Sequence, residues 1–260
     1  MIHFYDIDDA EGKPWSPNTQ RILYALVYSK RPFVRHGVPM VDIAKVLVPL
    51  GAKAHEDENE EVPYTLPAIT DDDAPQLGVI MGTFAIVEHL GLWPGSDEVQ
   101  ALTRRYRSAV SVIREREATM FIVPYVPARL EPRSAEYFVT SRNARFAPKT
   151  LDDFIAAQAA LDHGEELGHR LFTSLADVVA EWKQGHAPSS AEEATPYCLG
   201  KEPCYIDFCI ASFVFWVSSI RGATIAERAL DACANGASLR ALYGTVQANF
   251  GQEPYGRPAK

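Results

Sequence analysis

Apolar residues along the first fifty positions alternate between the spacing of strands and the spacing of helices. Residues 2–7, IHFYDI, alternate in polarity and are rich in residues that favour strands, which predicts a β-strand. From Pro17 onward, apolar residues recur three and four positions apart, as on one face of a helix. Residues 32–39 predict a second strand, and residues 41–52 predict an interrupted helical segment. The chain therefore opens with strand, helix, strand and helix.

The segment that follows predicts two short strands and a third helix. LPAIT (66–70) and QLGVIM (76–81) have the composition of strands and flank the turn-rich DDDAP. A helix is predicted over residues 83–90, closed by Gly91, whereas the acidic residues 53–62 predict an exposed loop. This order of elements is one that builds a four-stranded mixed sheet covered by helices.

Beyond the turn-rich stretch GLWPGSDE, the apolar spacing is almost entirely helical. Residues 99–123 and 150–182 each carry an apolar stripe at helical spacing. Residues 203–220 are apolar on every face, which is typical of a central helix surrounded by others. The pattern predicts two domains, an α/β domain over residues 1–95 and an all-α domain over residues 99–260.

Composition and charge narrow the class of protein. The chain has 260 residues, and 47% of them are hydrophobic, which is enough to bury a substantial core. The net charge of -9 disfavours a nucleic-acid partner, because such proteins need a basic face. The start lacks the features of a secretion signal, and the apolar stretch at 206–220 is too short for a membrane span and carries Asp207. We therefore expect a cytoplasmic protein without nucleic-acid or membrane partners.

Cysteine and histidine residues predict neither a metal site nor a redox motif. The cysteines form no CxxC pair and lack histidines at zinc spacing. In a reducing cytosol they are expected to be free thiols. They are Cys198, Cys204, Cys209 and Cys233.

The stretch WSPNT, between the first strand and the first helix, leaves two roles open for Ser16. A serine followed by proline at a helix start is typical of an N-cap, whose side chain accepts a backbone hydrogen bond. A hydroxyl in that position also lies in the favourable field of the helix N-terminus, where anionic ligands bind. The residues of this stretch by themselves favour the cap.

Three segments together indicate a known family. SPNT (16–19) opens the first helix, TLPAI (65–69) precedes the third strand, and PCYIDFCIAS (203–212) opens the apolar helix. In order and spacing they resemble the glutathione transferases, most closely the etherase-type, fungal-specific A class. The resemblance covers nearly the whole chain. It implies an N-terminal thioredoxin-like domain followed by an all-helical C-terminal domain, a homodimer, glutathione as co-substrate, and no metal.

The resemblance also implies a role for individual residues. Ser16 would hydrogen-bond the glutathione sulfur, because the thiolate is the nucleophile and a free thiol, with a pKa of about 8.5, is mostly protonated at neutral pH. Leu66 and a cis Pro67 would place the Leu66 backbone against the cysteinyl part of glutathione, like an added strand. Gly82 and Thr83 would receive the γ-glutamyl end.

Three positions depart from the pattern of the family. Gly82 stands where an acidic residue or Gln is usual, Leu23 where Arg is usual, and Cys204 in place of Ser or Thr. Gly82 offers no carboxylate to the ammonium group of glutathione, which should weaken binding by about 1.5 to 3 kcal/mol. CYID (204–207) still resembles a capping box in which Asp207 accepts the Cys204 N–H, a structural role.

Two functions therefore fit the sequence. One is a transferase that conjugates glutathione to hydrophobic aromatic electrophiles, or that uses glutathione to cleave such compounds. The alternative is a non-catalytic binder or carrier of aromatic small molecules on the same fold, which Gly82 and Leu23 favour. Two alternatives are open for the cluster of one methionine and two aromatic residues formed by Met120, Phe121 and Tyr125. It could line the pocket for the electrophile, but such clusters at helical spacing belong more often to the core.

Overall fold

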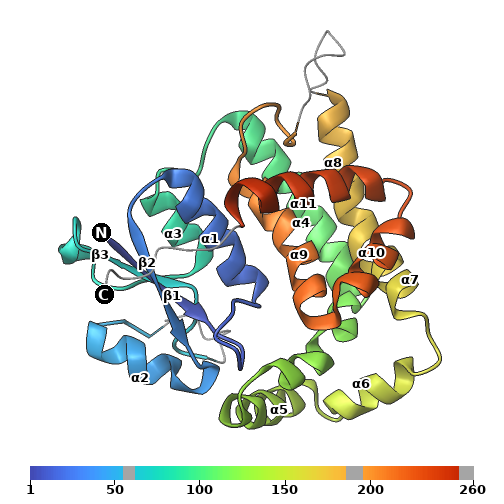
Figure 1. Ribbon diagram of the computed structural model, residues 1–260, viewed down its shortest axis with the longest axis horizontal. Helices are drawn as coiled ribbons and strands as arrows, with labels where there is room; N and C mark the ends of the chain where they lie inside the picture. The colour runs from blue at the N-terminus through green and yellow to red at the C-terminus, as the bar shows by residue number, and fades with distance from the viewer. Residues whose placement is uncertain (55–61, 186–195, 252–260) are drawn as a thin grey trace.

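The chain folds into a small sheet-containing part followed by a larger helical part (Figure 1). The structure, a computed structural model, describes residues 1–54, 62–185 and 196–251. Most of the acidic loop predicted at residues 53–62 lies outside the described residues. The predicted fold class, a thioredoxin-like domain followed by an all-helical domain, is confirmed.

Four strands form one mixed sheet in the order β2-β1-β3-β4. β1 (Ile2–Ile7) runs parallel to β2 (Phe33–Val38) and antiparallel to β3 (Ala68–Asp71), which pairs with the two-residue β4 (Ile80–Met81). The strand predicted at 76–81 is thus shorter than expected, because a 3₁₀ turn occupies its first residues.

Three helices accompany the sheet, as predicted. They are α1 (Pro17–Ser29), α2 (Ile43–Leu47) and α3 (Thr83–His89). α1 packs against α3, and Figure 1 shows α2 on the opposite side of the sheet. Leu23, where the family has Arg, is fully buried in the core and does not line the cleft described below. Leu23 therefore has a packing role in this structure.

Eight α-helices of the described chain follow the sheet. Their bounds are α4 (Asp97–Glu115), α5 (Pro132–Phe146), α6 (Leu151–Gln158), α7 (His163–Leu167), α8 (Thr173–Gly185), α9 (Tyr205–Arg221), α10 (Ala223–Asp231) and α11 (Gly236–Phe250). α9 packs against α1, α4, α10 and α11. This confirms the prediction of a central helix, and its apolar residues on all faces have neighbours to contact. Among the described residues, no helix is long and apolar enough to cross a bilayer.

The long helix predicted over residues 150–182 is broken in the structure. α6 ends at Gln158, and the side chain of Asp162 then accepts hydrogen bonds from the N–H groups of Gly164 and Glu165, which starts α7. An aspartate in that position satisfies N–H groups that would otherwise lack partners, so it favours a new helix start. The apolar stripe predicted over residues 150–182 is therefore distributed over three helices, α6, α7 and α8.

The helix predicted over residues 99–123 ends early. α4 stops at Glu115, Glu117 has a positive φ of 50°, and 3₁₀ turns follow at Ala118–Phe121 and Val123–Arg129. Proline residues in the second turn lack the N–H that a continuing α-helix requires. This irregular segment leads into α5, which the apolar pattern did not predict.

The sheet-containing part and the helical part are joined by polar contacts at one edge. Arg129 Nη2 donates to Asp9 Oδ2 at 2.9 Å, and Arg133 Nη2 donates to Asp42 Oδ1 at 2.9 Å. The N–H of Ala10 also donates to the carbonyl of Arg129 at 2.8 Å. These contacts hold the beginning of α5 beside the loops that follow β1 and β2.

Candidate functional site

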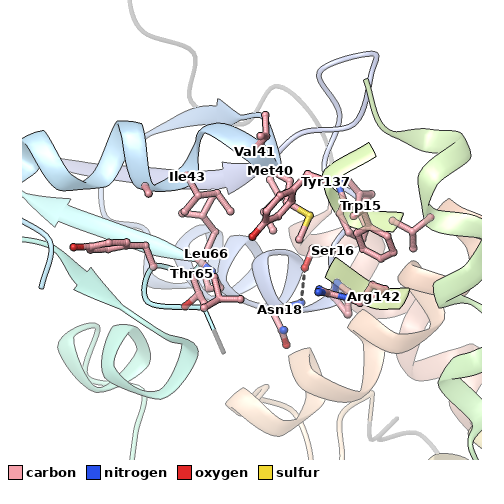
Figure 2. Close-up of a pocket in the computed structure, with 18 of the residues that line it drawn as sticks. Trp15, Ser16, Asn18, Met40, Val41, Ile43, Thr65, Leu66, Tyr137 and Arg142 are labelled. Carbon is pink, nitrogen blue, oxygen red and sulfur yellow. Dashed lines mark hydrogen bonds between the residues drawn. The ribbon is translucent and has the colours of Figure 1, made fainter. Parts of the chain in front are cut away.

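A cleft of about 730 Å³ lies between the two parts, beside the first turn of α1 (Figure 2). All five residues predicted to form the site line it, namely Ser16, Leu66, Pro67, Gly82 and Thr83. They come from three separate segments, the loop after β1, the approach to β3 and the start of α3. The fold therefore brings together what the sequence separates by more than sixty residues.

Ser16 is the N-cap of α1. Its Oγ accepts a hydrogen bond from the N–H of Asn18 at 3.3 Å, and the side chain is largely buried at the wall of the cleft. This bond uses a lone pair of the oxygen, so the hydroxyl proton stays available for another partner. Within the described part of the chain, no group accepts that proton. The cap and a donor role toward a ligand are therefore compatible.

Arg21 holds the first turn of α1 against the helical part. Its Nε donates to the carbonyl of Pro17 at 3.1 Å, and its Nη1 lies 3.9 Å from the sulfur of Cys209 on α9. The guanidinium also lies over the ring of Phe213, 6.0 Å from its centre. The helix start that carries Ser16 is thus fixed to α9 through one side chain.

The Leu66–Pro67 peptide bond is cis, as predicted from the sequence. Leu66 lies beyond the last pair of the β1–β3 ladder, Tyr5 with Ala68, so its backbone is at the end of the sheet. The carbonyl of Pro67 accepts the N–H of Gly82 at 3.0 Å, which ties the start of α3 to this turn.

Gly82 has a backbone conformation that favours glycine. Its φ is 90° and its ψ 147°, a region that other residues enter only with strain. A Cβ atom at this position would meet nothing within 4 Å, so the obstacle is the backbone and not the space. The backbone conformation therefore explains why glycine occupies this position, a reason that the resemblance to the family did not indicate.

The helical part contributes a wall that sequence reasoning missed. It consists of Val123, Val126, Tyr137, Phe138, Arg142 and Trp216. Trp15 meets Phe138 edge to face, with 6.5 Å between the ring centres. Arg142 is the only charged side chain among the described residues that line the cleft, and Figure 2 shows it reaching toward Ser16 and Asn18.

The aromatic cluster suggested as an acceptor wall does not line the cleft. Phe121 is buried in the core, and Tyr125 packs beneath the guanidinium of Arg221, 3.6 Å from the ring centre. Residues 123 and 126 from the same segment take that place instead. The segment follows 3₁₀ geometry. Of the two alternatives that the sequence left open for this cluster, a place in the core holds for Phe121.

The cysteines are structural. All four are free thiols, and burial raises the pKa of each of them. Cys204 begins α9 as its N-cap, and Asp207 accepts the N–H of Cys204 at 2.8 Å and that of Cys198 at 2.9 Å. A thiol with a raised pKa is a poor nucleophile at neutral pH. The predicted capping box is confirmed, and in the described residues no cluster of side chains is arranged to hold a metal ion.

Comparison with known proteins identifies a family and a set of similar structures. The family model for the glutathione S-transferase C-terminal domain matches residues 101–243. A search of curated protein sequences finds no match.

Fungal structures share the fold over nearly the whole chain. A glutathione S-transferase of Ceriporiopsis subvermispora, solved in complex with glutathione, is 24% identical, with a TM-score of 0.74 and coverage of 95% of this chain and 97% of that one. A second one from the same fungus, also in complex with glutathione, is 23% identical, with a TM-score of 0.75 and coverage of 95% and 98%. A glutathione transferase from Phanerochaete chrysosporium is 22% identical, with a TM-score of 0.75 and coverage of 95% and 96%.

Proposed function

The chain belongs to the glutathione S-transferase C-terminal domain family, and we propose that it is a glutathione transferase in which Ser16 stabilises the thiolate of glutathione. One observation carries the proposal: the five residues expected from the resemblance line a single cleft between the two parts. The glutathione present in two similar structures supports the choice of co-substrate.

In this proposal, the hydroxyl of Ser16 donates its free proton to the sulfur. The N-terminus of α1 adds a favourable field, because its first N–H groups point toward the same region. Both effects lower the pKa of the bound thiol, whose proton leaves to solvent. The thiolate then attacks an electrophilic carbon. A carbon–sulfur bond forms, and a leaving group departs with its electron pair or a double bond is saturated with uptake of a proton.

The remaining residues of the sheet side would hold the peptide. The backbone of Leu66 pairs with the cysteinyl part, since it lies at the open end of the sheet. The hydroxyl and N–H of Thr83 donate to the γ-glutamyl carboxylate. The opposite wall, with Phe138 and Trp216, would receive a hydrophobic aromatic electrophile.

The finer assignments are part of the same proposal. We assign the chain to the etherase-type, fungal-specific A class from SPNT and the two other segments, and similar structures from fungi support this. A homodimer is proposed from the same resemblance, whereas a cytoplasmic location and domains at 1–95 and 99–260 are proposed from the composition and the pattern of elements along the chain.

Calorimetric titration with glutathione, beside a conjugation assay with an activated aryl halide, tests the function. We expect saturable binding of one glutathione per chain and enzyme-dependent formation of the thioether. Binding without turnover over a panel of aryl halides, epoxides and aryl ethers would favour a carrier. Absence of glutathione binding would contradict the proposal.

A carboxylate at position 82 is expected to tighten glutathione binding relative to a variant that carries the same backbone strain without the charge. Gly82→Ala imposes the backbone strain, about 1 to 3 kcal/mol, without adding charge. Gly82→Asp imposes the same strain and adds a partner for the ammonium group. We expect Gly82→Asp to bind glutathione about ten-fold or more tightly than Gly82→Ala, and the difference to shrink with salt.

Equal affinities of the two folded variants, measured by calorimetry, would show that the ammonium group does not lie near residue 82. Circular dichroism and melting temperature provide the check that both variants keep the fold.

The second candidate function is binding of aromatic molecules without turnover. It is favoured by the largely apolar helical wall and by the absence of a carboxylate at Gly82, whereas Leu23 no longer bears on it because it lies in the core. A two-ring ligand that buries its faces at about 25 cal/mol per Å² reaches micromolar affinity. For a carrier, we expect such ligands to raise the melting temperature more than saturating glutathione does. The opposite order, with consumption of the aromatic compound, would favour the enzyme.

A further inference from the structure

Arg21 carries a positive charge between α1 and α9, behind the first turn of α1. The two helices pack against each other (Figure 1), and the side chain of Arg21 is partly buried between them. Its Nε donates to the carbonyl of Pro17 at 3.1 Å, so the side chain runs back toward the start of its own helix. Its Nη1 lies 3.9 Å from Cys209 Sγ, and the guanidinium lies over the ring of Phe213. The charge is therefore held against the residue that follows Ser16.

The polar groups around this guanidinium are neutral. The hydroxyls of Tyr106 on α4 and Tyr205 on α9 interact with Arg21, and so does the thiol of Cys209. Burial raises the pKa of all three groups, so they carry no charge at neutral pH. Within the described residues, Arg21 forms no ion pair with a carboxylate. Its positive charge is therefore not compensated by the groups that it contacts.

The buried carboxylates on the elements around α1 are engaged elsewhere. Asp6 on β1 accepts a hydrogen bond from Arg35 Nε at 2.7 Å. Asp207 on α9 accepts two backbone N–H groups at the start of that helix. No Asp or Glu lies among the described residues that line the cleft, where Arg142 is the one charged side chain. A thiolate in the cleft therefore lies in positive surroundings.

The place of Arg21 is unfavourable for the stability of α1 itself. The N-terminus of a helix has a positive partial charge, which repels a cation that reaches the first turn and favours an acidic residue there. The first turn of α1 contains no acidic residue. A helix start that is reinforced by a cation suits an anion bound in front of it.

We propose that the charge of Arg21 helps to hold the sulfur of glutathione at Ser16 in its thiolate form. The inference rests on the proposed transferase function and adds a residue to that site. Arg21 does not line the cleft, so it acts on the sulfur from behind the first turn and without contact. Its charge acts across protein, where screening is weaker than in water. Arg21 is therefore a positioning residue, which also fixes the turn that carries Ser16.

Two variants of Arg21 separate the effect of charge from that of packing. Arg21→Gln removes the charge, whereas Arg21→Lys keeps the charge and loses the planar guanidinium. The measurement is the pH midpoint at which bound glutathione becomes a thiolate, followed by its absorbance. We expect Arg21→Gln to move this midpoint to higher pH by about 0.5 to 1.5, the range for losing one partly screened charge. Arg21→Lys should keep the midpoint close to that of the parent.

Arg107 provides a matched control on α4. Its guanidinium lies over the ring of Phe84, 5.4 Å from the ring centre, as that of Arg21 lies over Phe213. Arg107 is exposed and does not line the cleft. Arg107→Gln removes the same charge from the surface, so it should leave the midpoint unchanged.

A thiol introduced into the protein tests the charge without glutathione. Ser16→Cys places a thiol at the start of α1, and the pH dependence of its reaction with iodoacetamide reports its ionisation. The native cysteines have raised pKa values, so they react slowly over the same pH range. Adding Arg21→Gln should move the midpoint of the introduced thiol to higher pH by a similar amount, whereas adding Arg21→Lys should not.

The outcomes separate this inference from the proposed function. An unchanged midpoint in folded Arg21→Gln would overturn the inference. Equal shifts in Arg21→Gln and Arg21→Lys would also overturn it, because packing and not charge would then be the cause. If Arg21→Gln does not fold, Arg21→Met supplies a neutral side chain for the same comparison. If the parent binds no glutathione, the proposed function fails, while a shift of the thiol introduced by Ser16→Cys still supports the effect of the Arg21 charge.

Discussion

Replacing Ser16 by alanine is expected to lower turnover with glutathione by about ten- to a thousand-fold, the range for losing one preorganised hydrogen-bond donor. The physical reason is that the variant raises the pKa of the bound thiol, so a smaller fraction is ionised at neutral pH. The measurement is a pH titration of the thiolate absorbance of bound glutathione, together with the pH dependence of kcat. Both curves should move to higher pH in Ser16→Ala.

Ser16 also caps α1, so a control must separate stability from chemistry. An N-cap serine replaced by alanine costs about 0.5 to 2 kcal/mol, whereas glycine at an N-cap costs only a few tenths. Ser16→Gly therefore keeps most of the helix stability while removing the hydroxyl. We expect Ser16→Gly to lose activity like Ser16→Ala, and Tyr137→Phe, which removes a second hydroxyl from the cleft lining, to keep it. Full activity in a folded Ser16→Gly would contradict the assignment, and loss in Tyr137→Phe alone would transfer the role to that residue.

The second large effect concerns stability and lies at the start of α9. Asp207 is fully buried and accepts the N–H groups of Cys204 and Cys198. Asp207→Ala leaves both donors buried without that acceptor, at a cost of about 2 to 4 kcal/mol in the free energy of unfolding. We expect the melting temperature to fall by roughly 5 to 15 °C. Denaturant titration and thermal unfolding measure both quantities.

The chain offers a matched control at a second capping box. Asp153 accepts the N–H of Thr150 at the start of α6, in an exposed position. Asp153→Ala makes the same chemical change where water replaces the lost partner, so its effect should be much smaller. Comparable losses of unfolding free energy in the two variants would show that the contribution of Asp207 to stability does not depend on its burial.

Sequence patterns predicted the elements whose apolar faces meet the core. The apolar residues of α1 recur at helical spacing as its burial requires, and α9 is apolar on every face because other helices surround it. β1 was predicted from its alternation and strand-forming residues, although five of its six residues are buried in the structure. The strand and the two helices could be predicted without knowledge of distant contacts. The cis bond before Pro67, in contrast, was predicted from a resemblance and not from the residues themselves.

The helical wall of the cleft could not be predicted in this way. α5 buries only Ser134 and Phe138, since much of its surface faces the cleft or solvent, so it has no clear apolar stripe. Whether Arg142 faces a cavity depends on how α5 sits beside the start of the chain. Gly82 likewise donates its N–H to the carbonyl of Pro67, a contact between segments that the local sequence does not encode.

The placement of α5 has a consequence for how this protein can be altered. α5 packs mainly against the 3₁₀ turns at Met40–Asp42 and Val123–Arg129 and against α6, whereas the main partners of α9 are α1, α4, α10 and α11. Side chains on the cleft-facing surface of α5 can therefore be exchanged without disturbing the helix that organises the core. A combinatorial library confined to that surface would vary what the cleft admits while the sheet side, with Ser16, stays constant. Under the proposed function, the environment of the thiolate and the choice of acceptor would be encoded in separate segments of the chain.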